Sequence, residues 1–135
     1  MIPRFVLVGF LMAHAAIHLG FVTPAPPAAP GAPPWPFDLG RSWLLSPLGI
    51  DPSLLRVIGF ALFAAIVAGY ALALIASVAS LPADLMGIGI IVGSAASLVL
   101  LLLFFHPWLM LGVAIDIALL WAVTTRWSVL GLVPQ

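Results

Sequence analysis

The sequence contains no cysteine, no lysine and no glutamate, and charged residues make up only 6% of its 135 residues. Without cysteine there is no disulfide, no thiolate ligand for a metal and no cysteine nucleophile. The four arginines and four aspartates balance to a formal net charge of zero. No basic patch is available for nucleic acid, so we expect no nucleic-acid partner.

Apolar sequence is abundant instead. Hydrophobic residues make up 64% of the chain, and so little charge cannot cover a soluble domain, in which about 25% of residues are charged. A bilayer, by contrast, needs no charge on the protein surface, and a helix crosses it with ~20 apolar residues. We therefore predict one all-α transmembrane domain over residues 1–135, with the lipid bilayer as its partner. The predicted spans are Arg4–Val22, Leu54–Ala79, Leu85–Phe105 and Trp108–Thr125.

The lengths of the links predict how the spans are arranged. Ser80–Asp84 and His106–Pro107 are short links, which favour an antiparallel four-helix bundle. The first link, residues 23–52, is long, and seven prolines lie between Thr23 and Pro36. This density of proline favours extended polyproline II and excludes helix over residues 24–36.

The second half of the long link has a different composition, FDLGRSWLLSPLGI. Asp38 is a residue type that caps helices. Trp43 and Leu44 suit a membrane surface. We therefore predict a short interfacial helix within Asp38–Leu45. The other tryptophans, together with Trp43, are expected to anchor the chain at the membrane interfaces; they are Trp35, Trp108, Trp121 and Trp127.

The orientation in the membrane is predicted from arginine. Arg4 and Arg126 lie on one side, and Arg41 and Arg56 on the other. Because Arg41 lies in a longer segment and Arg56 is already inside a helix, both termini are expected on the cytoplasmic side of a bacterial inner membrane. Two histidines inside the first apolar run argue against a cleaved signal peptide, so this run is expected to be retained.

Asp116 is the one aspartate of the four whose position is not explained by a helix end. Asp51 precedes Pro52 and reads as a helix N-cap with proline at the first helical position. Asp84 lies in the first turn of a span, where a negative charge suits the helix dipole. Asp116 instead lies within LMLGVAIDIALLWAV, and a carboxylate at that depth is unfavourable unless it is paired or protonated. It is therefore the leading candidate for a functional site.

Three histidines are placed to meet this carboxylate. At 1.5 Å per residue, His14 and Asp116 both lie ~12 Å below the same membrane face. His18 lies one turn from His14 on the same helix face, near the level of Arg56, and His106 lies at the mouth. We predict that Asp116 is within hydrogen-bonding or one-water reach of His14. His18 and His106 are expected to line the same cavity towards the mouth.

Several chemistries suit this set of residues, and no catalytic residue can be assigned. The HxxxH spacing of His14 and His18, with His106 and Asp116, could ligate zinc, copper or iron. A haem could be held by His14 or His18 opposite His106. A proton relay, or a quinone or lipid-headgroup site with Arg56 holding an anion, is a further alternative. Each of these makes the chain a redox or ligand-binding membrane protein.

The alternative is a non-catalytic accessory subunit of a larger membrane complex, in which a His14–Asp116 bond locks two helices together at ~0.6–2 kcal/mol. Two stripes of small residues allow close helix packing. One of them could contact a partner subunit or a second copy in a homo-oligomer. The stripes are Gly89, Gly93 and Ser97 in the third span, and Gly9, Ala13, Ala16 and Gly20 in the first.

The segment RFVLVGFLMAHAAIHLGF, eighteen of the 135 residues, resembles the opening helix of the DoxX-like proteins, which are small bacterial four-span membrane proteins. Arg4 and His14 are the positions that align. Where that family commonly continues His-Gly-x-x-Lys, this chain has His14-Ala15-Ala16-Ile17-His18. The resemblance implies a four-span fold, and some DoxX-like members are associated with quinone-linked sulfur oxidation.

Overall fold

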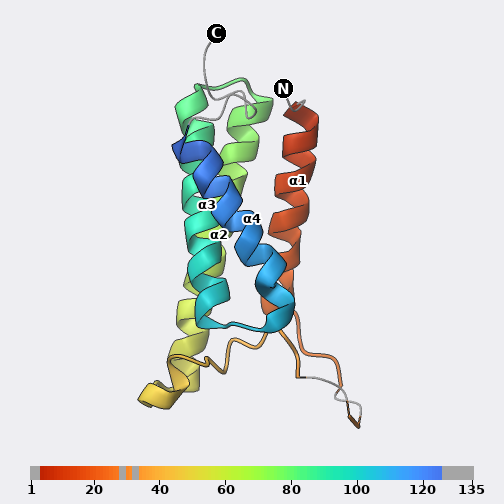
Figure 1. Cartoon of the computed structure of the whole chain (residues 1–135), viewed down its shortest axis with the longest axis vertical. Helices are drawn as coiled ribbons and strands as arrows, with labels where there is room; N and C mark the ends of the chain where they lie inside the picture. The colour runs from red at the N-terminus through yellow and green to blue at the C-terminus, as the bar shows by residue number, and fades with distance from the viewer. Residues whose placement is uncertain (1–3, 28–29, 32–33, 126–135) are drawn as a thin grey trace.

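A computed structural model describes residues 4–27, 30–31 and 34–125 of the chain. Within these residues the chain is all helix and loop, with no strand. Figure 1 shows the four main helices side by side, with α4 tilted against the others. Their bounds are α1 Arg4–Ile17, α2 Pro52–Val78, α3 Ala83–Leu103 and α4 Met110–Thr124. Short 3-10 helices are η1 His18–Phe21, η2 Ser46–Leu48 and η3 Pro107–Leu109.

The helices agree closely with the predicted spans. Three of them, over residues 52–78, 83–103 and 107–124, are long and apolar enough to cross a membrane. The first, Phe5–Phe21, is a shorter apolar helix whose last turn, η1, is 3-10. The chain therefore has the helix lengths and composition of a membrane protein. The expected interface residues Arg126 and Trp127 lie outside the described residues.

The predicted helix starts at Asp51 and Asp84 are confirmed. Asp51 Oδ1 accepts a hydrogen bond from the Ser53 backbone N–H at 2.8 Å, and Pro52 opens α2. The Ser53 hydroxyl bonds the same oxygen, and these two bonds hold the pKa of Asp51 below its usual value. Asp84 lies in the first turn of α3. Asp51 thus accepts from a backbone N–H at the start of α2, and Asp84 places a negative charge at the positive end of the α3 dipole.

The predicted helix within Asp38–Leu45 is wrong. Asp38 Oδ1 accepts from the Gly40 backbone N–H at 2.8 Å, so this carboxylate closes a turn instead of capping a helix. Residues 38–45 form turns and irregular chain, and the short helix begins later, at Ser46. As predicted, there is no regular secondary structure over residues 24–27, 30–31 and 34–36; residues 28–29 and 32–33 lie outside the description.

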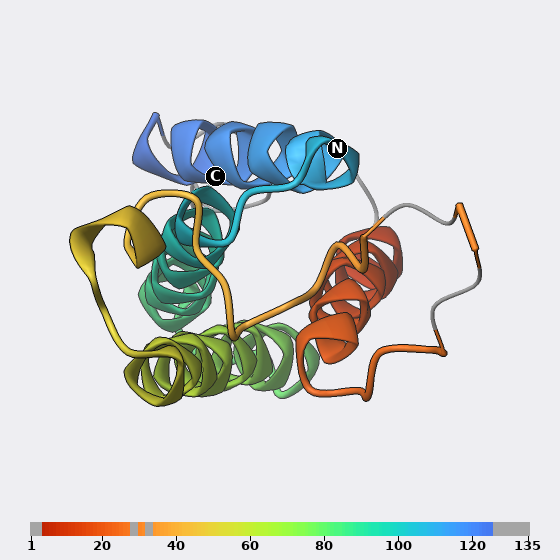
Figure 2. The same ribbon diagram turned by 90° about the horizontal axis from the view of Figure 1, so that it is seen from below.

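The long loop is tied to the end of α3. Ser42 Oγ donates to the Leu103 carbonyl at 2.5 Å, and Trp43 Nε1 donates to the Leu102 carbonyl at 2.7 Å. These carbonyls belong to the last turn of α3, where the carbonyl groups have no N–H partner within the helix. Figure 2 shows the loop crossing beneath the ends of the helices. The loop is therefore held as a cover over one end of the helices.

The predicted small-residue face of α3 packs against α2. A Cβ added to Gly69 would lie 2.4 Å from the Gly93 backbone nitrogen, and one added to Gly89 would lie 2.5 Å from the Ala73 nitrogen. Only glycine allows backbones to approach so closely. The α2–α3 contact is thus a backbone-to-backbone contact.

The small-residue stripe of α1 behaves differently. Gly9, Ala13 and Ala16 are exposed, and a Cβ added to Gly9 would meet nothing within 4 Å. Only Gly20 is tightly packed, 2.7 Å from the Phe37 ring by the same measure. Apart from Gly20, this stripe is not packed against other described residues, and its contact with a partner subunit stays a prediction.

Candidate functional site

The buried face of α1, continued into η1, carries two histidines. Leu7, Leu11, His14 and His18 recur at intervals of four, three and four residues, the spacing of one helix face. All four are buried, with His14 at 3% and His18 at 1% exposure. The same helix face that buries two leucines in the core therefore also points both imidazoles into the protein interior.

The carboxylate of Asp116, on α4, is fully buried and is bonded from all three other main helices. His14 Nε2, on α1, lies 2.8 Å from Oδ1. The hydroxyl of Tyr70, on α2, donates to the same oxygen at 3.1 Å. Ser97 Oγ, on α3, donates to Oδ2 at 2.5 Å. The predicted contact between His14 and Asp116 is confirmed.

His18 extends this arrangement by one helical turn. Its Nε2 lies 2.7 Å from Ser97 Oγ, and its Nδ1 lies 3.1 Å from the backbone carbonyl of His14. Ser94 Oγ bonds the Tyr70 hydroxyl at 3.0 Å. We call the resulting set the polar cluster: His14, His18, Tyr70, Ser94, Ser97 and Asp116.

Three members of the polar cluster were not expected as site residues. Tyr70 is the only tyrosine of the chain and lies in the middle of an apolar helix, which is the signal that could have indicated it. Ser97 was noted only as a small residue of the α3 stripe. Ser94 precedes it by three residues, so both hydroxyls lie on one helix face. Hydroxyl groups are common in apolar helices, and their partners are visible only once the helices are packed.

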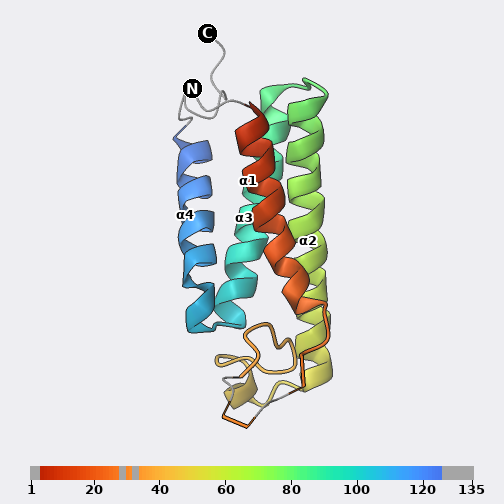
Figure 3. The same cartoon turned by 90° about the vertical axis from the view of Figure 1, so that its right-hand side faces the viewer.

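His106 and Arg56 are not part of the polar cluster, contrary to the predicted shared cavity. His106 Nδ1 accepts from the Trp108 backbone N–H at 3.3 Å and caps η3. Arg56 lies in the first turns of α2, whose N-terminal part extends past the end of α1 (Figure 3). The predicted depth of Arg56, which was counted from the helix ends, was wrong because the helices do not end at one level.

The polar cluster does not have the geometry of a metal centre. Among the described residues, no three histidine or aspartate side chains are arranged to hold a metal ion. His14 Nε2 faces Asp116, and His18 Nε2 faces Ser97. Because His106 lies elsewhere, the expected four-residue metal set and the haem pairing of His14 or His18 with His106 are not brought together.

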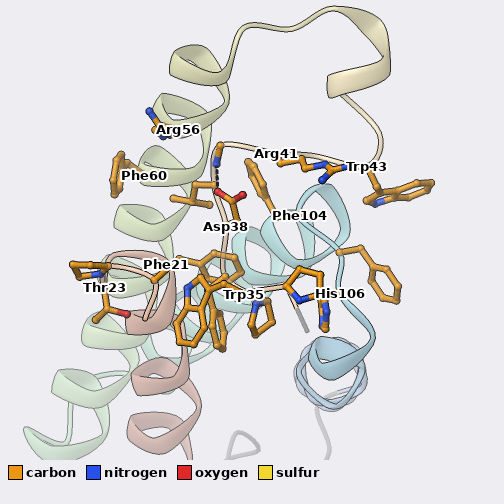
Figure 4. Close-up of a pocket in the computed structure, with 18 residues that line it drawn as sticks. Phe21, Thr23, Trp35, Asp38, Arg41, Trp43, Arg56, Phe60, Phe104 and His106 are labelled. Carbon is orange, nitrogen blue, oxygen red and sulfur yellow. Dashed lines mark hydrogen bonds between the residues drawn. The ribbon is translucent and has the colours of Figure 1, made fainter. Parts of the chain in front are cut away.

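Arg56 and His106 instead line a pocket of about 770 Å³ at the loop end of the molecule (Figure 4). We call it the loop pocket. Phe21 lines this pocket and also lies beside His18 of the polar cluster, with the two ring centres 6.4 Å apart. The other residues that line the pocket are Thr23, Pro24, Ala25, Pro34, Trp35, Pro36, Phe37, Asp38, Leu39, Gly40, Arg41, Trp43, Phe60, Phe104 and Phe105.

Comparison with known protein families, with curated proteins and with solved structures finds no match to this chain. The resemblance of its first helix to the DoxX-like proteins therefore stays a prediction.

Proposed function

We propose that this chain is an integral membrane protein, an antiparallel bundle of four spans, and that its polar cluster is an intramembrane proton-exchange site. The observation that carries this proposal is the hydrogen-bonded row from Asp116 through Ser97 to His18 and on to the His14 carbonyl.

The donors in this row can be counted. A backbone carbonyl only accepts, so His18 Nδ1 carries a hydrogen and donates it to His14 O. Ser97 has one hydroxyl hydrogen and two partners in the row, Asp116 Oδ2 and His18 Nε2. Within the row, that hydrogen points to one partner while the oxygen accepts from the other.

Two protonation states satisfy the same positions of the heavy atoms. In the first, His18 is an imidazolium that donates to Ser97, and Ser97 donates to an ionised Asp116. In the second, a protonated Asp116 donates to Ser97, and Ser97 donates to a neutral His18. The first becomes the second when His18 Nε2 passes a proton to Ser97 while Ser97 passes its own to Asp116. The total number of protons is unchanged.

The remaining members hold the carboxylate through this exchange. Tyr70 donates to Oδ1 in both states, and Ser94 bonds the Tyr70 hydroxyl in turn. His14 Nε2 bonds the same Oδ1, and its Nδ1 is buried with no partner among the described residues. His18 is the last titratable group of the row and lies one turn nearer the loop end than His14. This direction supports proton exchange between Asp116 and the loop end of the bundle.

The test is whether His18 and Asp116 change protonation together. In lipid nanodiscs, ¹⁵N chemical shifts separate the imidazolium and both neutral tautomers of His18, and the infrared carboxyl band reports Asp116. Because the exchange leaves the total number of protons unchanged, it is followed at fixed pH by changing the temperature. We expect the imidazolium signal of His18 and the carboxylate signal of Asp116 to gain or lose intensity together. The Ser97→Ala variant should uncouple them. Ser94→Ala, which removes a hydroxyl outside the row, is the matched control and should keep the coupling.

Three results would contradict the proposal. The first is a neutral His18 with its hydrogen on Nε2, because the donor count above requires hydrogen on Nδ1. The second is independent change, or no change, of the two groups in the unaltered protein. The third is unchanged coupling in Ser97→Ala.

We further propose that the membrane is a bacterial inner membrane and that both termini face the cytoplasm. The positions of Arg4 and Arg126 support this orientation, because arginine is enriched in cytoplasmic segments close to spans. The loop pocket then faces the opposite side of the membrane.

A further inference from the structure

The loop pocket has walls suited to an apolar ligand body. Phe21 and Phe37 meet edge to face at 5.1 Å between ring centres, and Trp35 lies 5.3 Å from Phe37. Phe60 on α2 and Phe104 at the end of α3 contribute further rings (Figure 4). Proteins use such aromatic walls to bury hydrocarbon.

The side chains that line the pocket carry a net positive formal charge. Arg41 and Arg56 both line it, and neither forms an ion pair with a carboxylate among the described residues. Asp38 is the one lining carboxylate, and Gly40 brings it near Arg56. A Cβ added to Gly40 would lie 3.2 Å from both Asp38 Oδ1 and Arg56 Nη2. Two guanidinium groups and one carboxylate sum to a formal charge of plus one, with His106 neutral.

Trp35 adds an unused donor. Its Nε1 is buried and has no hydrogen-bond partner among the described residues. A buried N–H without an acceptor is unfavourable by about 1–3 kcal/mol, so such groups are normally satisfied. Because Trp35 belongs to the wall of the pocket, an acceptor atom on a bound ligand could satisfy it.

We propose that the loop pocket binds the phosphodiester headgroup of an anionic phospholipid, with the lipid's apolar part against the aromatic walls. A phosphodiester carries one negative charge, which complements the formal charge of the pocket, and arginine is well suited to phosphate oxygens. The pocket lies at the helix ends, beside the exposed rings of Trp43 and Trp108, where a membrane protein meets headgroups. This inference concerns a different site from the polar cluster and does not depend on proton exchange there.

The experiment is native mass spectrometry of the full chain released from nanodiscs of phosphatidylglycerol or of phosphatidylcholine. We expect phosphatidylglycerol to be retained about tenfold more strongly, because both lipids carry the phosphodiester but the quaternary ammonium of phosphatidylcholine adds a positive charge beside the two guanidinium groups. Arg56→Gln and Arg41→Gln should each remove most of this preference. Trp35→Phe keeps an aromatic wall without the N–H donor and should reduce retention by a smaller factor.

Arg4→Gln is the matched control, since residue 4 begins α1 at the opposite end of the molecule (Figure 1). It should keep the preference for phosphatidylglycerol. Equal retention of both lipids, or unchanged retention in both pocket variants, would overturn the proposal. A parallel measurement adds inorganic phosphate to phosphatidylcholine nanodiscs. Binding of phosphate alone, with no preference for phosphatidylglycerol, would identify a site for a free anion and would also overturn it.

Discussion

Asp116 shows why a single residue can hold this molecule together. Its carboxylate is fully buried, yet it is bonded by one side chain from each of the other main helices, His14, Tyr70 and Ser97. A carboxylate in an apolar interior is tolerated when such donors replace its water. The residue that looks least compatible with a membrane helix is thus a common contact point for four helices.

A double-mutant cycle tests the central bond. We expect His14→Ala and Asp116→Ala to show a coupling free energy of about 0.6–2 kcal/mol, the range for interhelical hydrogen bonds in membranes. The measurement is reversible unfolding in detergent micelles or bicelles. His106→Ala with Asp116→Ala is the control pair and should be additive, since His106 bonds the Trp108 backbone instead. Additive effects for His14 and Asp116 would contradict the contact.

At the scale of helices, α1 is attached differently from the others. α2 and α3 touch through glycine backbones at Gly69, Gly89 and Gly93. His14 on α1 bonds α4, and His18 on the adjoining η1 bonds α3. The polar cluster therefore also helps to attach the first helix, and any exchange of protons there acts on a bond between helices.

Gly69→Ala tests the backbone contact. Its new methyl would lie 2.4 Å from the Gly93 nitrogen, so α2 and α3 must separate. We expect a loss of about 1–3 kcal/mol in the free energy of unfolding, as for other overpacked sites. Gly9→Ala adds the same methyl where nothing lies within 4 Å, and it should be neutral or slightly stabilising. Equal unfolding free energies for the two variants would refute the close contact.

At the scale of the whole molecule, the N-terminal end of α1 and the C-terminal end of α4 lie at one end and the long loop between α1 and α2 at the other (Figure 1). The proposed orientation can be measured directly because the chain has no cysteine, so one substitution introduces one thiol. In spheroplasts, a membrane-impermeant maleimide should label Thr23→Cys. Ala79→Cys, exposed at the opposite end, should be labelled only after permeabilisation. The reverse pattern would place the termini outside.

The sequence alone determined the helices and most of their ends. An apolar run of about twenty residues in a membrane satisfies its own backbone hydrogen bonds by forming a helix. Asp51 followed by Pro52 marks a helix start by local chemistry. Asp38 shows the limit of such signals, because the same side chain can close a turn or cap a helix. Depth along α1 and α4 also indicated the His14–Asp116 pair, since both residues were counted from the same membrane face.

Only the tertiary structure decided which hydroxyls complete the cluster and which cations stay outside it. Ser97 and Tyr70 meet Asp116 because α2 and α3 approach through glycines and turn those faces inward. Arg56 lies in the loop pocket because α2 extends beyond α1. Helix rotation and offset depend on contacts between segments far apart in the chain, and no local pattern contains them.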